Sequence, residues 1–241
     1  MIKSITDLSD IRGTQPLMSV IQTDFYFAIN DSDGVYVQLI EGEKTLVFSL
    51  RGGTSTICRL SENADVDELS SFLKFRQVGN ILSDFFFDGF GLEKRAVLKA
   101  MPQSGFFANT VVLTPASRLS DYQHVFNMLS KKGSFGAWYP AFSRKVNKSC
   151  ACGVYIAENS NAVSCAIAPF VFDKVGVVAG VYTDENHRKK GYATKCVKAL
   201  LSELRKKNVD NAYLWCEDKN VKFYEDIGFS LWGEIYAKEE K

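Results

Sequence analysis

A basic turn between two apolar segments has the residue types that hold an anionic ligand. Residues 188–193 (RKKGYA) follow an apolar run, 175–182, and precede an amphipathic one, 193–204. This order predicts a strand, a short turn and a helix. The first N–H groups of a helix have no partner within it, and the helix dipole places partial positive charge there. Because Gly191 also lets the backbone approach a ligand closely, we expect the turn to bind the pyrophosphate of an anionic cofactor.

Two common phosphate-binding patterns do not account for this turn. The sequence lacks G-x-x-x-x-G-K-[ST], and Gly191 stands alone where the dinucleotide fingerprint has three glycines. Taken alone, six such residues also fit a solvated basic turn, so the assignment depends on motifs further along the chain.

A second motif lies downstream of the amphipathic segment. After a strand-like run at 212–216, residues 223–229 read FYEDIGF. Gly228 suits a helix C-terminus, where a left-handed residue is favoured. The segment therefore predicts a short helix that ends near Gly228, with the last strands beginning at Phe229.

Together the R-x-x-G-x-A turn and the F-Y-x-x-x-G-F segment resemble the two signatures of the GNAT N-acetyltransferase family. The resemblance covers roughly residues 107–241. It implies a mixed, mostly antiparallel sheet flanked by helices, acetyl-CoA as acyl donor, and direct acetyl transfer to a primary amine of a small molecule or protein. One position departs from the family: Glu217 stands where many members have Asn. Asn220 is closer to Tyr224, so we expect the short helix to begin late.

The resemblance also assigns roles to residues. Tyr224 would be the catalytic general acid that protonates the leaving thiolate. The end of the strand before the turn would bind the pantetheine arm through its backbone, and a backbone N–H near Val181 would polarise the thioester carbonyl. The expected cofactor-binding residues are Val181, Tyr182, Thr183, Arg188, Lys189, Lys190, Gly191, Tyr192 and Ala193.

The general base is left open by the sequence. The run 175–183 has no carboxylate, so a water chain, a backbone carbonyl, Glu158 or Glu217 could serve. His187 is expected to be solvated in an exposed turn. Cys196 and Cys216 lie in apolar segments with no neighbouring histidine, and we do not expect them to be nucleophiles.

Composition sets further bounds. The 241 residues are 46% hydrophobic, which predicts a soluble globular protein of one large or two small domains. A net charge of +1 gives no case for nucleic acid or an anionic membrane as partner. Without a signal peptide or a long apolar run we expect a cytoplasmic protein. The six cysteines are then expected to be reduced, and their spacing together with only two histidines predicts no metal site.

These motifs need a scaffold, which hydrophobic periodicity outlines. We expect an N-terminal α+β domain at 1–106, compatible with a degenerate GNAT-like half, and the GNAT domain at 107–241. The first part predicts helices at 16–29 and 65–82, strands at 35–40, 44–50 and 54–60, and a linker at 101–109. The second part predicts strands at 111–113, 152–157, 162–170, 175–183 and 212–216, and helices at 115–130, 134–146 (interrupted near Pro140) and 193–204.

Two alternatives accompany the enzyme interpretation. A GNAT fold without activity, which binds CoA or acts by interaction, is favoured by the missing strand carboxylate. An acyltransferase for a longer chain would have a larger pocket. The aromatic segment 85–90 (FFFDGF) could line an acceptor pocket, although core packing is its simpler interpretation.

Overall fold

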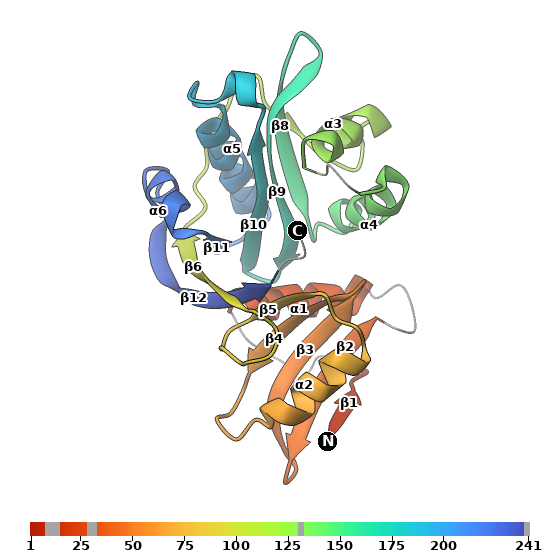
Figure 1. Ribbon diagram of the computed structural model, residues 1–241. Helices are drawn as coiled ribbons and strands as arrows, with labels where there is room; N and C mark the ends of the chain where they lie inside the picture. The colour runs from red at the N-terminus through yellow and green to blue at the C-terminus, as the bar shows by residue number, and fades with distance from the viewer. Residues whose placement is uncertain (8–14, 28–32, 130–132, 239–241) are drawn as a thin grey trace. The chain divides into compact units, whose positions relative to one another are not determined.

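The computed structural model describes residues 1–7, 15–27, 33–129 and 133–238 (Figure 1). The chain forms two compact units. Unit 1 comprises Met1–Val97, Trp215–Val221 and Leu231–Lys241, and unit 2 comprises Leu98–Leu214 and Lys222–Ser230. The domain boundary expected between residues 106 and 107 stays a prediction.

Unit 1 is a mostly antiparallel sheet with two helices. Strands β2, β3 and β4 form an antiparallel meander, β1 pairs with β2, and β5 pairs parallel to β4 and antiparallel to β12. Strand β6 (Glu93–Ala100) begins in unit 1 and ends in unit 2. The other elements are β1 (Ile2–Ser4), α1 (Pro16–Phe27), β2 (Gly34–Ile40), β3 (Glu43–Arg51), β4 (Thr54–Arg59), α2 (Val66–Phe75), β5 (Asn80–Ser83) and β12 (Ser230–Lys238).

The two helices of unit 1 lie on opposite faces of its sheet (Figure 1). Successive strand residues point to opposite faces. Phe48 accordingly packs in one core with Leu69 and Leu73 of α2, whereas Ser49 donates a hydrogen bond of 2.9 Å to Asp24 of α1. Strand β3 is therefore covered on both sides.

The aromatic segment 85–90 belongs mainly to the α2-side core. Phe85, Phe87 and Phe90 are buried there. Phe86 is exposed, and its ring meets Tyr236 edge-on at 5.6 Å. Three of the four rings thus pack as the simpler interpretation predicts.

The helix predicted at 65–82 is too long. Helix α2 ends at Phe75, and Gln77 has a left-handed φ of 52°. The N–H of Val78 turns back to the carbonyl of Leu73 at 3.1 Å, which closes the helix. Ile81, whose spacing fits the helix, instead belongs to β5 and pairs with Ser55 of β4.

Unit 2 contains strands β7 to β10 and most of β11, which belong to the same twelve-stranded sheet as the strands of unit 1. Strands β7, β8, β9 and β10 are successive antiparallel neighbours, and β11 pairs parallel to β10. Strand β11 and helix α6 run across the boundary between the units. The elements are β7 (Val111–Val112), α3 (Leu119–Leu129), α4 (Phe135–Asn147), β8 (Cys152–Glu158), β9 (Asn161–Phe172), β10 (Val175–Thr183), the short 3-10 helix η1 (Glu185–His187), α5 (Tyr192–Lys206), β11 (Asn211–Cys216) and α6 (Asp218–Glu225).

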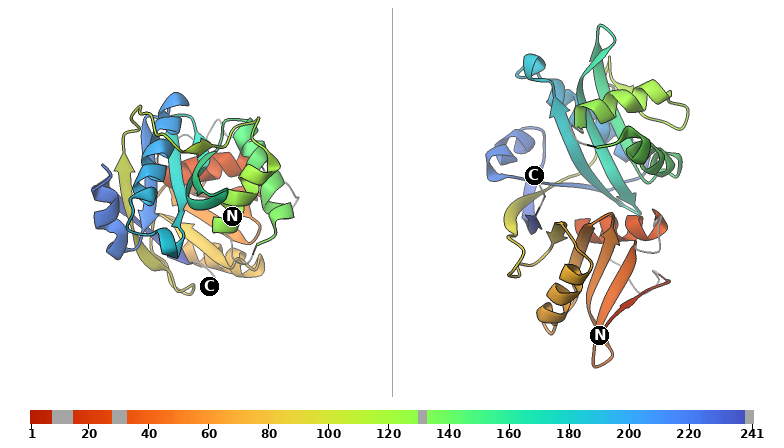
Figure 2. Two further views of the ribbon diagram at one scale, coloured as in Figure 1. Left: turned by 90° about the horizontal axis from the view of Figure 1, so that it is seen from above. Right: turned by 45° about the vertical axis from the view of Figure 1, so that its right-hand side comes forward.

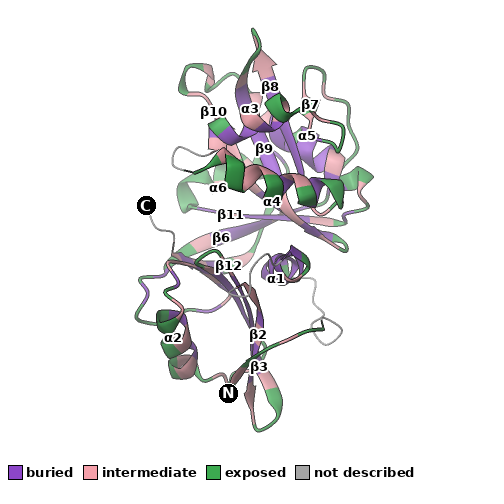
Figure 3. Ribbon diagram, turned by 90° about the vertical axis from the view of Figure 1, so that its right-hand side faces the viewer, coloured by how far each residue is buried: buried purple, intermediate pink, exposed green. Residues whose placement is uncertain are grey.

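Helices cover both faces of the β8–β10 meander (Figure 2). On one face Cys165 and Ile167 of β9 share a core with α3 and α4. On the other face α5 packs against β8 and β9, and its Cys196 is fully buried. Helix α6, by contrast, has no buried residue and is largely exposed (Figure 3).

The interruption predicted near Pro140 is absent, since α4 runs through this proline. A proline inside a helix removes one backbone hydrogen bond. Packing offsets that loss: Trp138 and Phe142 on either side stack with ring centroids 4.7 Å apart, and Phe142 is buried.

The two units share one order of elements. In unit 1, α1 precedes the antiparallel strands β2–β4, then α2 and the parallel strand β5. In unit 2, α4 precedes β8–β10, then α5 and the parallel strand β11. The turn predicted to bind phosphate lies between the third strand and the second helix of this order in unit 2.

Candidate functional site

Strand β10 separates from β11 before either strand ends. Their parallel pairing joins Val175–Val177 to Asn211–Tyr213, while β10 continues to Thr183 and β11 to Cys216. On the other edge β10 remains paired with β9 as far as Thr183. The β11-facing backbone of residues 178–183 is thus available to a ligand. Val181, Tyr182 and Thr183, the residues expected to bind the pantetheine arm, lie in this stretch. Two of their carbonyls are already engaged: that of Tyr182 accepts from Ser164 Oγ at 3.0 Å and that of Thr183 from Arg188 Nε at 3.3 Å.

Gly180 allows β10 to bend away from β11. The pairing of β10 with β9 is irregular on both sides of Ala179, and Gly180 has a left-handed φ of 56°. A Cβ here would lie 2.9 Å from Leu129 Cδ2 and 3.0 Å from Ile167 Cγ1. Both the conformation and the close packing require glycine.

The start of α5 has free backbone donors. Gly191 is its N-cap residue, with φ 79°, and the first hydrogen bond within the helix joins the N–H of Lys195 to the carbonyl of Gly191 at 3.0 Å. No side chain among the described residues caps this end. A Cβ built on Gly191 would meet none of the described heavy atoms within 4 Å. The helix terminus is therefore open where the sequence predicts a pyrophosphate.

The turn itself has two left-handed residues, Lys189 with φ 62° and Gly191. Such backbone turns point successive N–H groups into one concavity and form anion-binding nests. Arg188 turns back along the strand: its Nε donates to the carbonyl of Thr183 at 3.3 Å. Lys189 and Lys190 are exposed, so their charges act at the rim of the turn.

Tyr224 lies in α6 and is half-buried. Its ring meets Phe229 edge-on at 5.9 Å, and its carbonyl accepts the N–H of Phe229 at 3.1 Å. Gly228 has φ 112°, which suits the helix end that the motif predicts. The expected late start of this helix is wrong, because α6 begins at Asp218 and already includes Asn220.

His187 is not the solvated residue that the sequence predicts. Its side chain is only 27% exposed and lies between two carboxylates. Nδ1 is 2.9 Å from Asp184 Oδ1, and Nε2 is 3.5 Å from Glu158 Oε2. The turn of η1 brings the ring back toward the end of β8.

Glu158 and Tyr192 complete this cluster. The Tyr192 hydroxyl donates a short hydrogen bond to Glu158 Oε1. Glu158 therefore contacts the first residue of α5, and its carboxylate is already engaged. Sequence reasoning named Glu158 and His187 singly but did not bring them together. The Asp184–His187 spacing was the only local signal.

The cysteines behave as buried thiols. Burial raises the pKa of Cys196 to about 11 and also raises the pKa of Cys216. All six cysteines are free. Within the described ranges no three His, Cys, Asp or Glu side chains are grouped so that they could hold a metal ion.

Comparison with known protein families tests the resemblance to the GNAT family. Residues 121–229 match the model of the acetyltransferase (GNAT) family. They are a GNAT acetyltransferase domain. This stretch contains the phosphate turn and Tyr224, so the family resemblance of the sequence is confirmed.

Solved structures extend the fold likeness over the whole chain. A GCN5-related N-acetyltransferase from Kribbella flavida matches with a TM-score of 0.60 and 13% identity, covering 91% of this chain and 93% of that one. A GCN5-related N-acetyltransferase from Sphaerobacter thermophilus matches with a TM-score of 0.59 and 10% identity, and the match covers 99% of this chain and 95% of that one. A tandem GNAT protein from the clavulanic acid biosynthesis pathway matches with a TM-score of 0.59 and 9% identity, and the match covers 95% of this chain and 89% of that one. At these identities the likeness is one of fold. Comparison with curated protein sequences gave no match.

The GNAT domain is evidence for an acyltransferase that uses acetyl-CoA. None of the helices in the described parts of the chain is long and apolar enough to cross a membrane. The cytoplasmic location stays a prediction.

Proposed function

We propose that the protein is an acetyl-CoA-dependent N-acetyltransferase whose acceptor is a primary amine. One observation carries the proposal: the uncapped start of α5, with left-handed Gly191, directly follows a strand whose backbone is free of β11. These features lie within the stretch that matches the GNAT family.

The residues of unit 2 fit the cofactor piece by piece. The amides of residues 188–193 would bind the pyrophosphate, because a helix N-terminus favours negative charge. The freed backbone of Val181, Tyr182 and Thr183 would hydrogen-bond the amide groups of the pantetheine arm. Since main-chain groups make these contacts, the side chains of Lys189 and Lys190 should contribute modestly.

Acetyl-CoA supplies a thioester, whose acyl carbon a neutral amine can attack. Tyr224 would donate its phenolic proton to the sulfur that leaves. A backbone N–H near Val181 would stabilise the negative charge that develops on the carbonyl oxygen.

The general base that removes the amine proton is not a carboxylate of β10, because this strand has none. Both candidate carboxylates have partners: Glu158 contacts Tyr192 and His187, and Glu217 forms an ion pair with Lys219 at 2.5 Å. Either carboxylate, a backbone carbonyl or a water chain remains for the role. The same lack of a strand carboxylate favours the second candidate, a GNAT fold that binds CoA without catalysis.

The start of α2, the equivalent helix in unit 1, does not suit a phosphate. Its helix α2 is capped by Asp65, whose Oδ1 accepts the N–H of Glu68 at 2.9 Å. Asp67 and Glu68 add negative charge to the first turn, which disfavours an anion there. We therefore assign acetyl-CoA binding to unit 2 alone.

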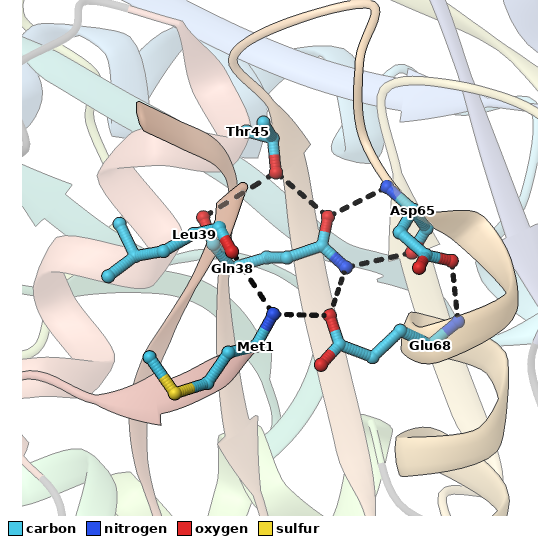
Figure 4. Close-up of polar contacts among 6 residues, drawn as sticks. All are labelled: Met1, Gln38, Leu39, Thr45, Asp65 and Glu68. Carbon is cyan, nitrogen blue, oxygen red and sulfur yellow. Dashed lines mark hydrogen bonds and ion pairs between the residues drawn. The ribbon is translucent and has the colours of Figure 1, made fainter. Parts of the chain in front are cut away.

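A hydrogen-bond network around the buried Gln38 fixes this end of α2 (Figure 4). The Gln38 amide nitrogen donates to the Asp65 carbonyl and to Glu68 Oε2, both at 2.8 Å. Its oxygen accepts the N–H of Asp65 at 2.9 Å and the Thr45 hydroxyl at 2.8 Å. The amino group of Met1 lies 3.0 Å from Glu68 Oε2. Protein groups thus take the place that a ligand would need.

The test is release of free thiol from acetyl-CoA in the presence of a diamine, an amino sugar or a lysine-containing peptide, with mass spectrometry of the product. Formation of an amide product supports the proposal. Acetyl-CoA binding without product from these amines would favour the non-catalytic candidate, and absence of binding would exclude both.

A further inference from the structure

We propose that Asp184, His187, Glu158 and Tyr192 form a brace that holds the phosphate turn in its binding conformation, and that His187 is its central member. The inference rests on the proposed function, since it concerns the same acetyl-CoA site. The four residues come from the end of β10, from η1, from the end of β8 and from the first position of α5.

The contacts of the brace enclose the turn from both ends. Before the turn, Asp184 Oδ1 accepts the N–H of Asn186 at 3.0 Å and lies 2.9 Å from His187 Nδ1. After the turn, the Tyr192 hydroxyl donates to Glu158 Oε1. His187 Nε2, 3.5 Å from Glu158 Oε2, links the two halves. Residues 188–191 therefore lie between two segments that side-chain contacts hold in place, 184–187 before the turn and Tyr192 after it.

His187 faces two carboxyl groups through its ring nitrogens. Nδ1 hydrogen-bonds with Asp184 Oδ1 at 2.9 Å, and Nε2 lies 3.5 Å from Glu158 Oε2. Both nitrogens therefore contact groups of the protein itself, and we assign His187 to positioning the turn.

Other charged groups near the ring are accounted for. Glu185 of η1 pairs with Arg188, whose Nη2 lies 3.5 Å from Glu185 Oε1. The hydrogen bond from His187 and the Asn186 amide lower the pKa of Asp184, and the hydrogen bond to Glu158 raises the pKa of Tyr192. The groups that face His187 are therefore the carboxyl groups of Asp184 and Glu158 and the ring of Tyr192, whose centroid lies 6.3 Å from that of His187.

The brace would change the affinity for acetyl-CoA by changing the fraction of molecules whose turn has the binding conformation. If only a fraction of molecules has the binding conformation of the turn, the apparent Kd for acetyl-CoA rises by the inverse of that fraction. Removal of one contact of the brace should lower that fraction and so raise the apparent Kd.

The test compares H187Q and Y192F with H124Q, which changes the only other histidine of the chain. The Kd for acetyl-CoA is measured for each variant and divided by the Kd of the wild type in the same buffer. We expect H187Q to raise Kd about tenfold and Y192F to raise it as well, because each removes a contact of the brace. H124Q should give a ratio near one. A ratio near one for H187Q would overturn the proposal.

A second measurement needs no ligand. Hydrogen exchange of the amides in residues 188–194 of the free protein should be several-fold faster in H187Q and Y192F than in the wild type at pH 6, with melting temperatures close to that of H124Q. Unchanged exchange contradicts the brace. Faster exchange in a protein that fails to bind acetyl-CoA would instead retain the brace and reject the proposed function.

Discussion

At the residue scale the proposed activity depends on few side chains. We assign cofactor binding to backbone groups of the turn and of β10. Tyr224 is then the main side chain with a proposed catalytic role. Its place in α6 is fixed by packing against Phe229 and by the Phe229 N–H bond to its carbonyl. Its proposed role as general acid can be tested by a substitution that removes only the phenolic oxygen.

Tyr224→Phe should lower kcat for amine acetylation about 10²–10⁴-fold, because the leaving thiolate loses its proton donor. Steady-state kinetics and calorimetry with acetyl-CoA separate turnover from binding, and we expect Kd to change less than twofold. Tyr236→Phe, a half-buried tyrosine of β12, is the matched control. Wild-type turnover in Tyr224→Phe would remove the general-acid role.

The sequence predicts some of these residues and misses others for a physical reason. Gly191 and Tyr224 stand in contiguous motifs, so local spacing identifies them. Glu158 and His187 are brought together only by the folding of β8–β10, and no local pattern reports a contact across that meander. The solvated state predicted for His187 was wrong for the same reason.

At the element scale the contrast between α2 and α5 explains why equivalent helices would differ in function. Both follow a strand that pairs parallel to the next one. Helix α2 caps its own N-terminus through Asp65, whereas α5 begins at Gly191 without a side-chain cap. Periodicity predicted β10 to the residue, but it missed β6, whose first residues Glu93, Lys94 and Arg95 hide the strand pattern.

Asp65→Ala should lower the free energy of unfolding by about 0.5–2 kcal/mol, because the N–H of Glu68 loses its cap. Denaturant titration measures this change, and Asp65→Asn, which keeps an oxygen acceptor, should lose less. The Kd for acetyl-CoA should stay the same in both variants. A weakened Kd with unchanged stability would contradict the structural role given to this residue.

At the scale of the whole molecule the chain contains one order of elements twice. Each unit has a helix, an antiparallel three-stranded meander, a second helix and a parallel strand. Self-similarity was not visible in the sequence because packing constrains hydrophobic pattern more than residue identity.

We expect one molecule of acetyl-CoA per chain, bound by unit 2. Native mass spectrometry of the protein with a tenfold excess of acetyl-CoA counts the bound molecules directly. Two specific molecules per chain would show that unit 1 also binds the cofactor and would contradict the role given to the α2 cap.

The most direct test of the central claim is calorimetric titration of acetyl-CoA, with ATP beside it, into the wild type, Gly191→Val and Gly42→Val. Gly42 also has a left-handed φ, 86°, and open space around it, so its variant carries the same backbone strain in the β2–β3 turn of unit 1. We predict binding of acetyl-CoA but not of ATP in the wild type and in Gly42→Val. Affinity in Gly191→Val should fall at least a hundredfold, because a side chain occupies the place of the pyrophosphate. Equal affinity in Gly191→Val and the wild type would contradict the assignment of acetyl-CoA to this turn.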